Sequence, residues 1–356
     1  MTEDETDSTA ATRQAAGDRS DRYRVLLVDD EPDLVAVAAE YLERLDDHLT
    51  VESTTDARSA LARLESAQFD CVVSDYEMPV MDGVEFLEAV RETDATLPFI
   101  LFTGKDSETV ANRALSANVT DYLRKQHSTD QFAFLARKIV GYVEQDRARG
   151  DRQRYIDALV EFYEITNDTD RSFEDRVRAV LELGTEYLGV PYGFLTRIER
   201  PDPADPSRGT QTIVLSVGDH ELLQPGESNR LSNSYCRLTI QHEDLFGIQN
   251  AIDAGMRDDP GYQTFELGCY IGGTTNVEDI LYGTLCFASR DPRDLDFSVE
   301  ERSFVWIAKQ WVSYELDRMG GEWTAEVVAD VGDVADAGDE PDDGEVTGTD
   351  AGDSDE

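Results

Sequence analysis

The sequence predicts an α/β fold in which a doubly wound, five-stranded parallel sheet is followed by an α+β unit built on an antiparallel sheet. In the first 145 residues, short apolar runs alternate with helix-like stretches. This alternation is typical of repeated strand–helix units. Further along, an amphipathic stretch precedes several strand-like runs and a closing helix-like stretch. That order favours an antiparallel sheet flanked by helices.

The first unit contains five strand-like runs rich in Val, Ile, Leu or Phe. We expect strands at residues 24–28, 49–53, 70–74, 98–102 and 119–123. Helical patterns follow them at residues 34–45, 57–64, 84–90, 109–115 and 132–143. In parallel sheets of this kind, ligands bind beyond the carboxyl ends of the strands.

The second unit begins with an amphipathic helix predicted at residues 172–188. Its strands are expected at residues 192–198, 212–217, 270–275 and 281–289, and its closing helix at residues 297–316. The intervening segment 141–154 is charged and mostly compatible with a helix, with Gly150 as its weak point.

These patterns divide the chain into five parts. They are an acidic tail expected to be disordered (1–21), the parallel-sheet unit (22–146), a helical linker (147–171), the antiparallel-sheet unit (172–319) and a second disordered acidic tail (320–356). The last part carries fourteen acidic residues and no basic ones. Such a composition cannot bury enough apolar surface to fold.

The formal charge of −44 arises from 76 acidic and 32 basic residues, of which only Lys105, Lys125, Lys138 and Lys309 are lysines. Self-repulsion at this charge opposes compaction, and concentrated salt screens it. Acidic excess with scarce lysine therefore favours a halophilic protein. An ordinary acidic protein with a disordered tail is the alternative. The same charge repels nucleic-acid phosphates and anionic lipid, so neither is expected as a partner.

The four cysteines, Cys71, Cys236, Cys269 and Cys286, lie in or beside apolar runs, and no CxxC motif occurs. This usage indicates buried thiols in a reducing compartment. The first 21 residues contain no apolar core of signal-peptide type, and no apolar stretch approaches the roughly 18 residues of a membrane span. We therefore expect a cytoplasmic protein.

Chemistry-bearing side chains collect at the predicted strand ends. Asp29 and Asp30 follow the first strand, Asp75 the third, Thr103 ends the fourth and Lys125 follows the fifth. Together they provide the parts of a Mg²⁺ site that receives a phosphoryl group. A lysine there supplies a compact point charge that an arginine fork does not. Each aspartate alone could simply cap a helix, whereas the full set is difficult to explain by capping.

Four motifs carry a resemblance to a known family. They lie at residues 28–32 (VDDEP), 74–83 (SDYEMPVMDG), 102–105 (FTGK) and 121–125 (DYLRK). In this order they resemble the receiver domain of two-component response regulators, which has a flavodoxin-like fold. The resemblance implies that Asp75 is the nucleophile and becomes a 4-aspartylphosphate.

The resemblance also implies a ligand set and a switch. Asp30 and Asp75 would bind Mg²⁺ directly and Asp29 through water, with the main-chain carbonyl of Glu77 completing the protein ligands. Two other roles follow from the same resemblance. Thr103 would donate its hydroxyl to a phosphoryl oxygen, and Lys125 would pair with Asp75 and then with the phosphoryl group. Tyr122 would move inward when Thr103 turns toward phosphate. Pro79, Gly83 and Gly104 are expected to serve turn geometry alone.

Residues 155–317 resemble a GAF domain, a sheet-based sensor module, so the chain as a whole looks like a receiver–GAF protein of haloarchaeal type. The resemblance is carried by residues 233–240, 250–256, 267–274 and 282–288. A candidate ligand pocket would be lined by Tyr235, Cys236, Tyr262, Phe265, Cys269 and Tyr270. The alternative is that these side chains form core, and for Cys236 a buried thiol is favoured over a chromophore attachment point.

The function that these features favour is that of a response regulator. A sensor histidine kinase would phosphorylate Asp75, and the state would pass to the GAF module or to a downstream signalling protein. The chain would catalyse only its own phosphotransfer and dephosphorylation. A phosphate relay or sequestering protein, or a small-molecule sensor coupled to the receiver, are the alternatives.

Other classes of function lack their sequence features. A transcription factor would need a helix-turn-helix or a basic patch. A histidine kinase would need a phosphorylatable histidine and a glycine-rich nucleotide lid, and a phosphodiesterase or cyclase its metal or nucleotide motifs; none of these is evident. A homodimer is also considered. Heptad-like apolar positions indicate pairing but are interrupted by charge; they are Leu135, Ile139, Tyr142, Leu159 and Phe162.

Overall fold

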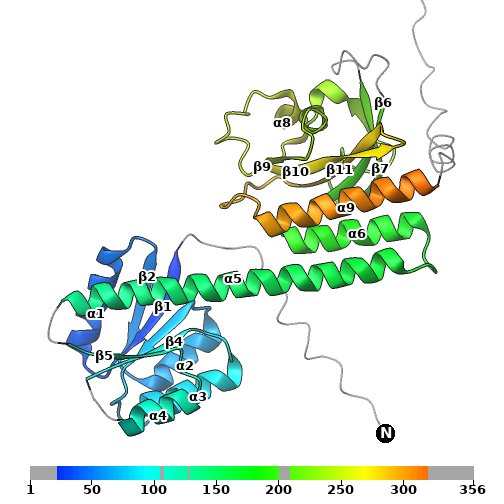
Figure 1. The fold of residues 1–356 in the computed structure, drawn as a ribbon. Helices are drawn as coiled ribbons and strands as arrows, with labels where there is room; N and C mark the ends of the chain where they lie inside the picture. Colours follow the sequence, from blue (N-terminus) through cyan, green and yellow to red (C-terminus); the bar gives the residue numbers. More distant parts are fainter. Residues whose placement is uncertain (1–21, 105–107, 127–128, 200–208, 320–356) are drawn as a thin grey trace, which may run out of the picture.

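The computed structural model describes residues 22–104, 108–126, 129–199 and 209–319 (Figure 1). The two tails predicted to be disordered, 1–21 and 320–356, lie outside these residues. Two sheets are present, one at each end of a long helix (Figure 1). None of the described helices has the length and apolar character needed to cross a bilayer.

The first sheet is parallel throughout and has the order β2-β1-β3-β4-β5. Its strands are β1 (Tyr23–Val28), β2 (Leu49–Thr54), β3 (Cys71–Ser74), β4 (Phe99–Thr103) and β5 (Asp121–Arg124). All five predicted strands are present within two residues of their expected bounds. The chain reverses its direction of progress across the sheet between β1 and β3, which is where such sheets bind ligands.

Helices cover both faces of this sheet. They are α1 (Pro32–Leu45), α2 (Ala57–Ser66), α3 (Gly83–Thr93), α4 (Glu108–Ser116) and the first part of α5 (Asp130–Asn167). Apolar residues of α1 and α5 form one core with the sheet, and those of α2, α3 and α4 form the other. The α3 helix begins at Asp82 with a capping box, so its entry beside the strand ends is fixed locally.

The α5 helix is a single 38-residue helix. It contains the predicted helix 132–143, the charged segment 141–154 and most of the segment expected to link the two units. Gly141 and Gly150 are exposed within it and do not interrupt the helix. Figure 1 shows α5 running from the first sheet to the helices of the second.

The second sheet is antiparallel throughout, with the order β8-β7-β6-β11-β10-β9. Its strands are β6 (Tyr192–Glu199), β7 (Thr210–Val217), β8 (Ser228–Arg230), β9 (Leu245–Ile248), β10 (Cys269–Val277) and β11 (Ile280–Ser289). The four predicted strands form its centre. The two strands that were not predicted, β8 and β9, are short and lie at its edges.

Helices α6 (Phe173–Leu188) and α9 (Val299–Arg318) pack on one face of this sheet, and the second part of α5 packs on them as a further layer (Figure 1). Packing explains why residue 184 of α6 is a glycine, since a Cβ there would lie 2.3 Å from the ring of Phe287 on β11. The other face carries α7 (Cys236–Thr239), α8 (Pro260–Phe265) and the 3₁₀ turn η2 (Leu231–Asn233) over a second apolar cluster. None of these three short elements was predicted.

The heptad-like stripe on α5 is not available for pairing. Leu135 and Ile139 are buried against the first sheet, and Phe162 is buried against α9. Tyr142 is half-buried in the first of these contacts, and Leu159 is also half-buried. The expectation that this stripe joins two copies is therefore wrong, because intramolecular packing uses it.

Candidate functional site

The predicted strand-end residues meet at the carboxyl edge of the first sheet. Asp29 and Asp30 follow β1, and Asp75 follows β3, its immediate neighbour. One carboxylate oxygen from each of the three residues lies within 4.8 Å of the others. Asp29 and Asp75 are buried and Asp30 is half-buried. Three carboxylates at this separation repel one another unless a cation lies between or beside them.

Lys125 supplies one such cation from the end of β5. Its Nζ lies 2.6 Å from Asp29 Oδ2 and 3.0 Å from Asp75 Oδ1. Burial disfavours the charged amine, but the hydrogen bond to Asp29 and the charges of Asp75 and Asp29 outweigh it and raise the pKa of Lys125. The ammonium is therefore a fixed charge at neutral pH.

The main chain around Asp75 is tied to its carboxylate. The backbone N–H of Glu77 donates to Asp75 Oδ2 at 3.1 Å, and the Ser74 hydroxyl donates to the Asp75 carbonyl at 2.8 Å. Asp75 Oδ1 is buried without a well-aligned hydrogen-bond partner among the described residues, although the Lys125 ammonium lies beside it. A buried carboxylate oxygen with spare capacity beside two further carboxylates fits Mg²⁺, which takes oxygen ligands and retains waters.

Thr103 and Tyr122, the predicted switch pair, lie on the two adjacent strands β4 and β5. Thr103 is buried at the end of β4, and its carbonyl accepts the backbone N–H of Lys125 at 2.8 Å. Tyr122 is half-buried and packs against the core beneath α3 and α4. The structure thus brings Asp29, Asp30, Asp75 and Lys125 together at this edge, with the backbone of Glu77 beside Asp75. Thr103 ends the neighbouring strand β4, whereas Tyr122 lies within β5.

Gly83 has a role that the sequence reasoning missed. A Cβ at this position would lie 2.2 Å from the carbonyl oxygen of Asp75. Its φ is not in the left-handed region, so the expectation that turn geometry alone requires glycine here is wrong. Close approach of α3 to the segment after Asp75 excludes a side chain instead.

Arg113 of α4 was also missed. Its guanidinium lies 2.9 Å from Asp82 Oδ2 and donates to the Tyr76 hydroxyl at 3.3 Å. It therefore ties α4 to the loop that follows Asp75. The Asp-Gly pair at residues 82–83 was the available signal, but nothing local to it indicates an arginine thirty-one residues away.

Comparison with known proteins gives a family match in the part of the chain that contains this site. Residues 25–135 match the sequence model of the response regulator receiver domain. These residues contain the acidic cluster and the lysine. Residues 25–135 form a response regulator receiver domain.

Several known proteins are similar to this chain over part of its length. The transcriptional regulatory protein TrcR of Mycobacterium tuberculosis is 35% identical over 111 residues, which cover 30% of this chain and 41% of TrcR. The bacterioopsin transcriptional activator of Halobacterium salinarum is 25% identical over 233 residues, covering 64% of this chain and 32% of that protein. This chain therefore spans less than half the length of either relative.

Among solved structures, the chemotaxis response regulator CheY4 of Vibrio cholerae is 28% identical. The alignment covers 33% of this chain and 98% of CheY4, with a TM-score of 0.31.

The candidate ligand pocket of the second unit is packed in the structure. Tyr235, Cys236, Phe265 and Tyr270 are buried in the cluster beneath α7 and α8. The Tyr270 hydroxyl lies 3.0 Å from Cys286 Sγ and 2.7 Å from the hydroxyl of Thr239, a residue of α7. These contacts favour the interpretation of the aromatic residues and Cys236 as core.

Cys269 is the exception within this set. Successive residues of a strand point to opposite faces of its sheet. Cys269 accordingly lies in the cluster beneath α6 and α9, whereas Tyr270 faces α7. The expectation that Cys269 shares a pocket with Tyr235, Cys236 and Tyr270 is therefore wrong.

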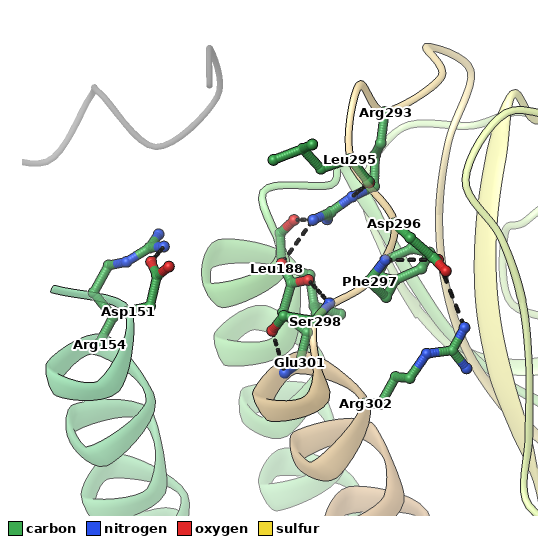
Figure 2. A network of polar contacts seen from close by, with 10 residues as sticks. All are labelled: Asp151, Arg154, Leu188, Arg293, Leu295, Asp296, Phe297, Ser298, Glu301 and Arg302. Carbon is green, nitrogen blue, oxygen red and sulfur yellow. Dashed lines mark hydrogen bonds and ion pairs between the residues drawn. The ribbon is translucent and has the colours of Figure 1, made fainter. Parts of the chain in front are cut away.

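A cavity of about 360 Å³ lies beside α5, at the junction of α6 and α9. Figure 2 shows some of the polar contacts around it, among them those of Arg154, Arg293 and Glu301. Arg293 donates to the Leu188 carbonyl and to Glu301 Oε1, each at 2.7 Å, while Arg154 of α5 pairs with Asp151 at 2.7 Å. Arg293 and Glu301 therefore pair with each other on one side of the cavity. Arg154 and Asp151 pair with each other on the side formed by α5.

Proposed function

We propose that this chain is a two-component response regulator that accepts a phosphoryl group on Asp75 from a histidine kinase. The observation that carries the proposal is the convergence of three carboxylates and the Lys125 ammonium at the carboxyl edge of a receiver sheet. Beyond the receiver match, the roles of single residues are part of the proposal.

In the proposed reaction, a carboxylate oxygen of Asp75 attacks the phosphorus of a phosphohistidine. A P–O bond forms as the P–N bond breaks, and the departing imidazole leaves as neutral histidine after taking up a proton. Attack by a carboxylate on phosphorus requires neutralisation of negative charge on both partners. Lys125 provides part of this charge and would follow the phosphoryl oxygens once they arrive.

The acidic cluster is proposed to hold Mg²⁺ through Asp30 and Asp75, with Asp29 acting through water and the Glu77 main-chain carbonyl as a further ligand. The bound ion would offset the charge of the phosphoryl oxygens. The all-oxygen donor set and the spare capacity of Asp75 Oδ1 support this assignment.

The switch is proposed to run from Thr103 to Tyr122. The Thr103 hydroxyl would donate to a phosphoryl oxygen, and the space it leaves would admit the Tyr122 ring. Both residues lie on adjacent strands, which supports a direct coupling. A local change of charge would thus bias an element with two packing arrangements.

The division of the chain is likewise a proposal. Residues 22–146 would form the receiver, 147–171 a helical linker and 172–319 a GAF sensor module, with acidic tails at 1–21 and 320–356. The six-stranded antiparallel sheet with α6 and α9 on one face supports the GAF assignment. The net charge of −44 supports an output that does not bind nucleic acid and a halophilic setting.

Phosphoryl uptake tests the proposal. Incubation with acetyl phosphate and Mg²⁺ in concentrated KCl should add one phosphoryl group, measured by intact mass. Asp75→Asn should add none, and chelation of Mg²⁺ should abolish uptake by the unmodified protein. Asp47→Asn, at an exposed position of the same domain, is the matched control and should be modified normally. Modification of Asp75→Asn to the same extent would contradict the assignment.

A further inference from the structure

An arginine of α4 contacts both ends of the loop that follows Asp75. The Arg113 guanidinium lies 2.9 Å from Asp82 Oδ2 and donates to the Tyr76 hydroxyl at 3.3 Å. Tyr76 is the first residue after Asp75, and Asp82 is the last residue before α3 begins. We refer to residues 76–82 as the acceptor loop, because they follow the proposed phosphoryl acceptor.

The two ends of the acceptor loop meet at the main chain of Asp75. The Tyr76 carbonyl accepts the backbone N–H of Met78 at 3.1 Å and that of Gly83 at 2.9 Å, and these bonds close the loop. A Cβ on Gly83 would lie 2.2 Å from the Asp75 carbonyl oxygen, so α3 begins in direct contact with this residue. A shift of either end of the loop therefore displaces the main chain around Asp75.

Asp82 uses its two carboxylate oxygens for different contacts. Oδ1 accepts the backbone N–H groups of Val84 and Glu85, at 2.9 and 2.8 Å, and so caps α3. Oδ2 contacts Arg113. Because the cap fixes Asp82 on α3, the guanidinium joins α4 to an anchored carboxylate. The Arg113 and Asp82 side chains are exposed by 42% and 25%, so their ion pair is a weak one.

The acceptor loop also carries the backbone that the proposed metal site uses. The N–H of Glu77 donates to Asp75 Oδ2 at 3.1 Å, and the Glu77 carbonyl is the proposed main-chain ligand of Mg²⁺. Glu77 directly follows Tyr76, whose side chain Arg113 contacts. Displacement of a catalytic group by about 1 Å costs up to roughly a hundredfold in rate. The rate of phosphoryl transfer therefore depends on how often this backbone is in place.

We propose that Arg113 is a positioning residue for phosphoryl transfer to Asp75, an inference that rests on the proposed function. It acts through Tyr76 and Asp82, by holding the acceptor loop in the arrangement that places the Glu77 backbone beside the acceptor. Loss of the contact lets the loop adopt other arrangements. The apparent Mg²⁺ affinity and the transfer rate then fall with the fraction of molecules in the competent arrangement.

A second arginine joins the same two helices at their other ends. Arg91, near the end of α3, donates to the carbonyl of Asn118, just after α4, at 3.1 and 3.2 Å. It also donates to the carbonyls of Asp94 and Leu97 at 3.2 and 2.8 Å. Arg91 thus makes more hydrogen bonds than Arg113 but lies away from the acceptor loop. Its removal separates an effect on stability from an effect on positioning.

Acetyl phosphate labelling of the full chain at one KCl concentration tests the proposal. Arg113→Ala should slow phosphorylation of Asp75 by about two- to fivefold, the range for loss of an exposed ion pair, and should raise the Mg²⁺ concentration that gives half the maximal rate. Arg91→Ala is the matched control. It should lower the unfolding temperature more and leave the rate per folded molecule unchanged.

The outcomes separate this inference from the proposed function. An unchanged rate in Arg113→Ala, or equal slowing in Arg91→Ala, would overturn the positioning role while Asp75 remains the acceptor. Absence of labelling in the unmodified protein would refute the proposed function and this inference with it.

A double-mutant cycle tests the route through Asp82. Asparagine caps a helix as well as aspartate does but removes the charge that Arg113 contacts. Asp82→Asn should therefore slow phosphorylation to about the same extent as Arg113→Ala. The double variant should be no slower than either single variant, because both changes break one contact. Arg113→Lys keeps the charge and should recover part of the rate. Additive losses would rule out action through Asp82.

Hydrogen exchange gives a readout that does not require phosphoryl transfer. In the Mg²⁺-free protein, Arg113→Ala should speed exchange of the Met78 and Gly83 amides, whose bonds to the Tyr76 carbonyl close the acceptor loop. Arg91→Ala should leave these amides unchanged. Equal protection of the two amides in Arg113→Ala and in the unmodified protein would contradict the proposal, even if the transfer rate fell.

Discussion

At the scale of single residues, Lys125 occupies a position that few side chains could fill. Its one nitrogen contacts two carboxylates, Asp29 and Asp75, from separate strands. A planar guanidinium is larger and offers its donors in a fixed fork, so it cannot occupy the same point between them. The scarcity of lysine in the chain draws attention to this residue but does not identify it. Lys309 is also one of the four lysines, but it lies buried against β10, where burial lowers its pKa.

We therefore expect Lys125→Arg to slow phosphorylation of Asp75 by roughly a hundredfold, the usual loss when a charge-stabilising donor is displaced. The unfolding temperature should change little. Lys138→Arg is the matched control, because Lys138 pairs with Asp121 on the same domain surface and outside the acidic cluster. Rates from acetyl phosphate labelling check the expectation, and equal rates for the two variants would contradict the role of Lys125.

At the scale of elements, α5 depends on packing rather than on propensity. Glycine in a helix interior costs about 1 kcal/mol relative to alanine, yet α5 contains two. Its two ends are held by the receiver core and by α6 and α9, which outweighs that cost. Arg176 contributes at the far end by donating to the Thr166 carbonyl of α5 and to Glu315 of α9.

Gly150→Ala should raise the free energy of unfolding by about 0.5–1 kcal/mol. A Cβ at this position would meet nothing within 4 Å, so only backbone entropy changes. Gly184→Ala, the same substitution in α6, should destabilise the protein because its Cβ would overlap Phe287. Denaturant unfolding checks both, and a gain for both or a loss for both would be inconsistent with this account.

The ion pair between Arg176 and Glu315 should make stability depend on pH. Burial tends to raise the pKa of Glu315, but hydrogen bonds from Arg318 and Arg176 outweigh it, so the pKa lies below its ordinary value of 4.5. The folded state then holds its proton less tightly than the unfolded state. The stabilisation is complete above about pH 5 and is lost as the pH falls through the lowered pKa.

Glu315→Gln should cost about 3 kcal/mol at pH 7, because it leaves the buried Arg176 charge unpaired. The variant should also lose less stability than the unmodified protein between pH 7 and pH 4. Unfolding free energies across this range measure both effects. Parallel pH curves for the two proteins would show that Glu315 is not the group responsible.

At the scale of the whole molecule, the net charge of −44 governs how the compactness of the chain depends on salt. The acidic residues lie along the entire chain, so no single contact can compensate for their repulsion. Salt shortens the screening length to about 3 Å at 1 M, which removes most repulsion between exposed carboxylates. Compactness should therefore depend on the solvent more than is usual for a protein of this size.

The unfolding temperature should rise by about 10 °C between 0.2 M and 3 M KCl, corresponding to a few kcal/mol for units of this size. Sucrose favours burial without screening charge and serves as the control, so it should give a smaller rise. An unfolding temperature that does not change with KCl concentration would contradict both the dominant role of charge repulsion and the halophilic setting.

The sequence by itself was sufficient for the receiver fold and for its acidic edge. Buried parallel strands are continuous apolar runs, and polar residues just beyond them must meet at one edge whatever the loop details. Asp29, Asp75 and Lys125 could therefore be grouped from the sequence alone. The four central strands of the second sheet could also be predicted, because the apolar pattern of each strand lies within its own segment.

Tertiary structure alone decided the features that depend on distant partners. It determined that Gly83 is required by close approach to Asp75, that Cys269 faces away from Tyr270, and that β8 and β9 form the edges of the second sheet. It also determined which apolar residues of α5 are exposed. Their periodicity is the same whether they are buried or exposed. Only the positions of both sheets reveal that Leu135 and Phe162 are buried and that Ile156, Val160 and Tyr163 remain accessible.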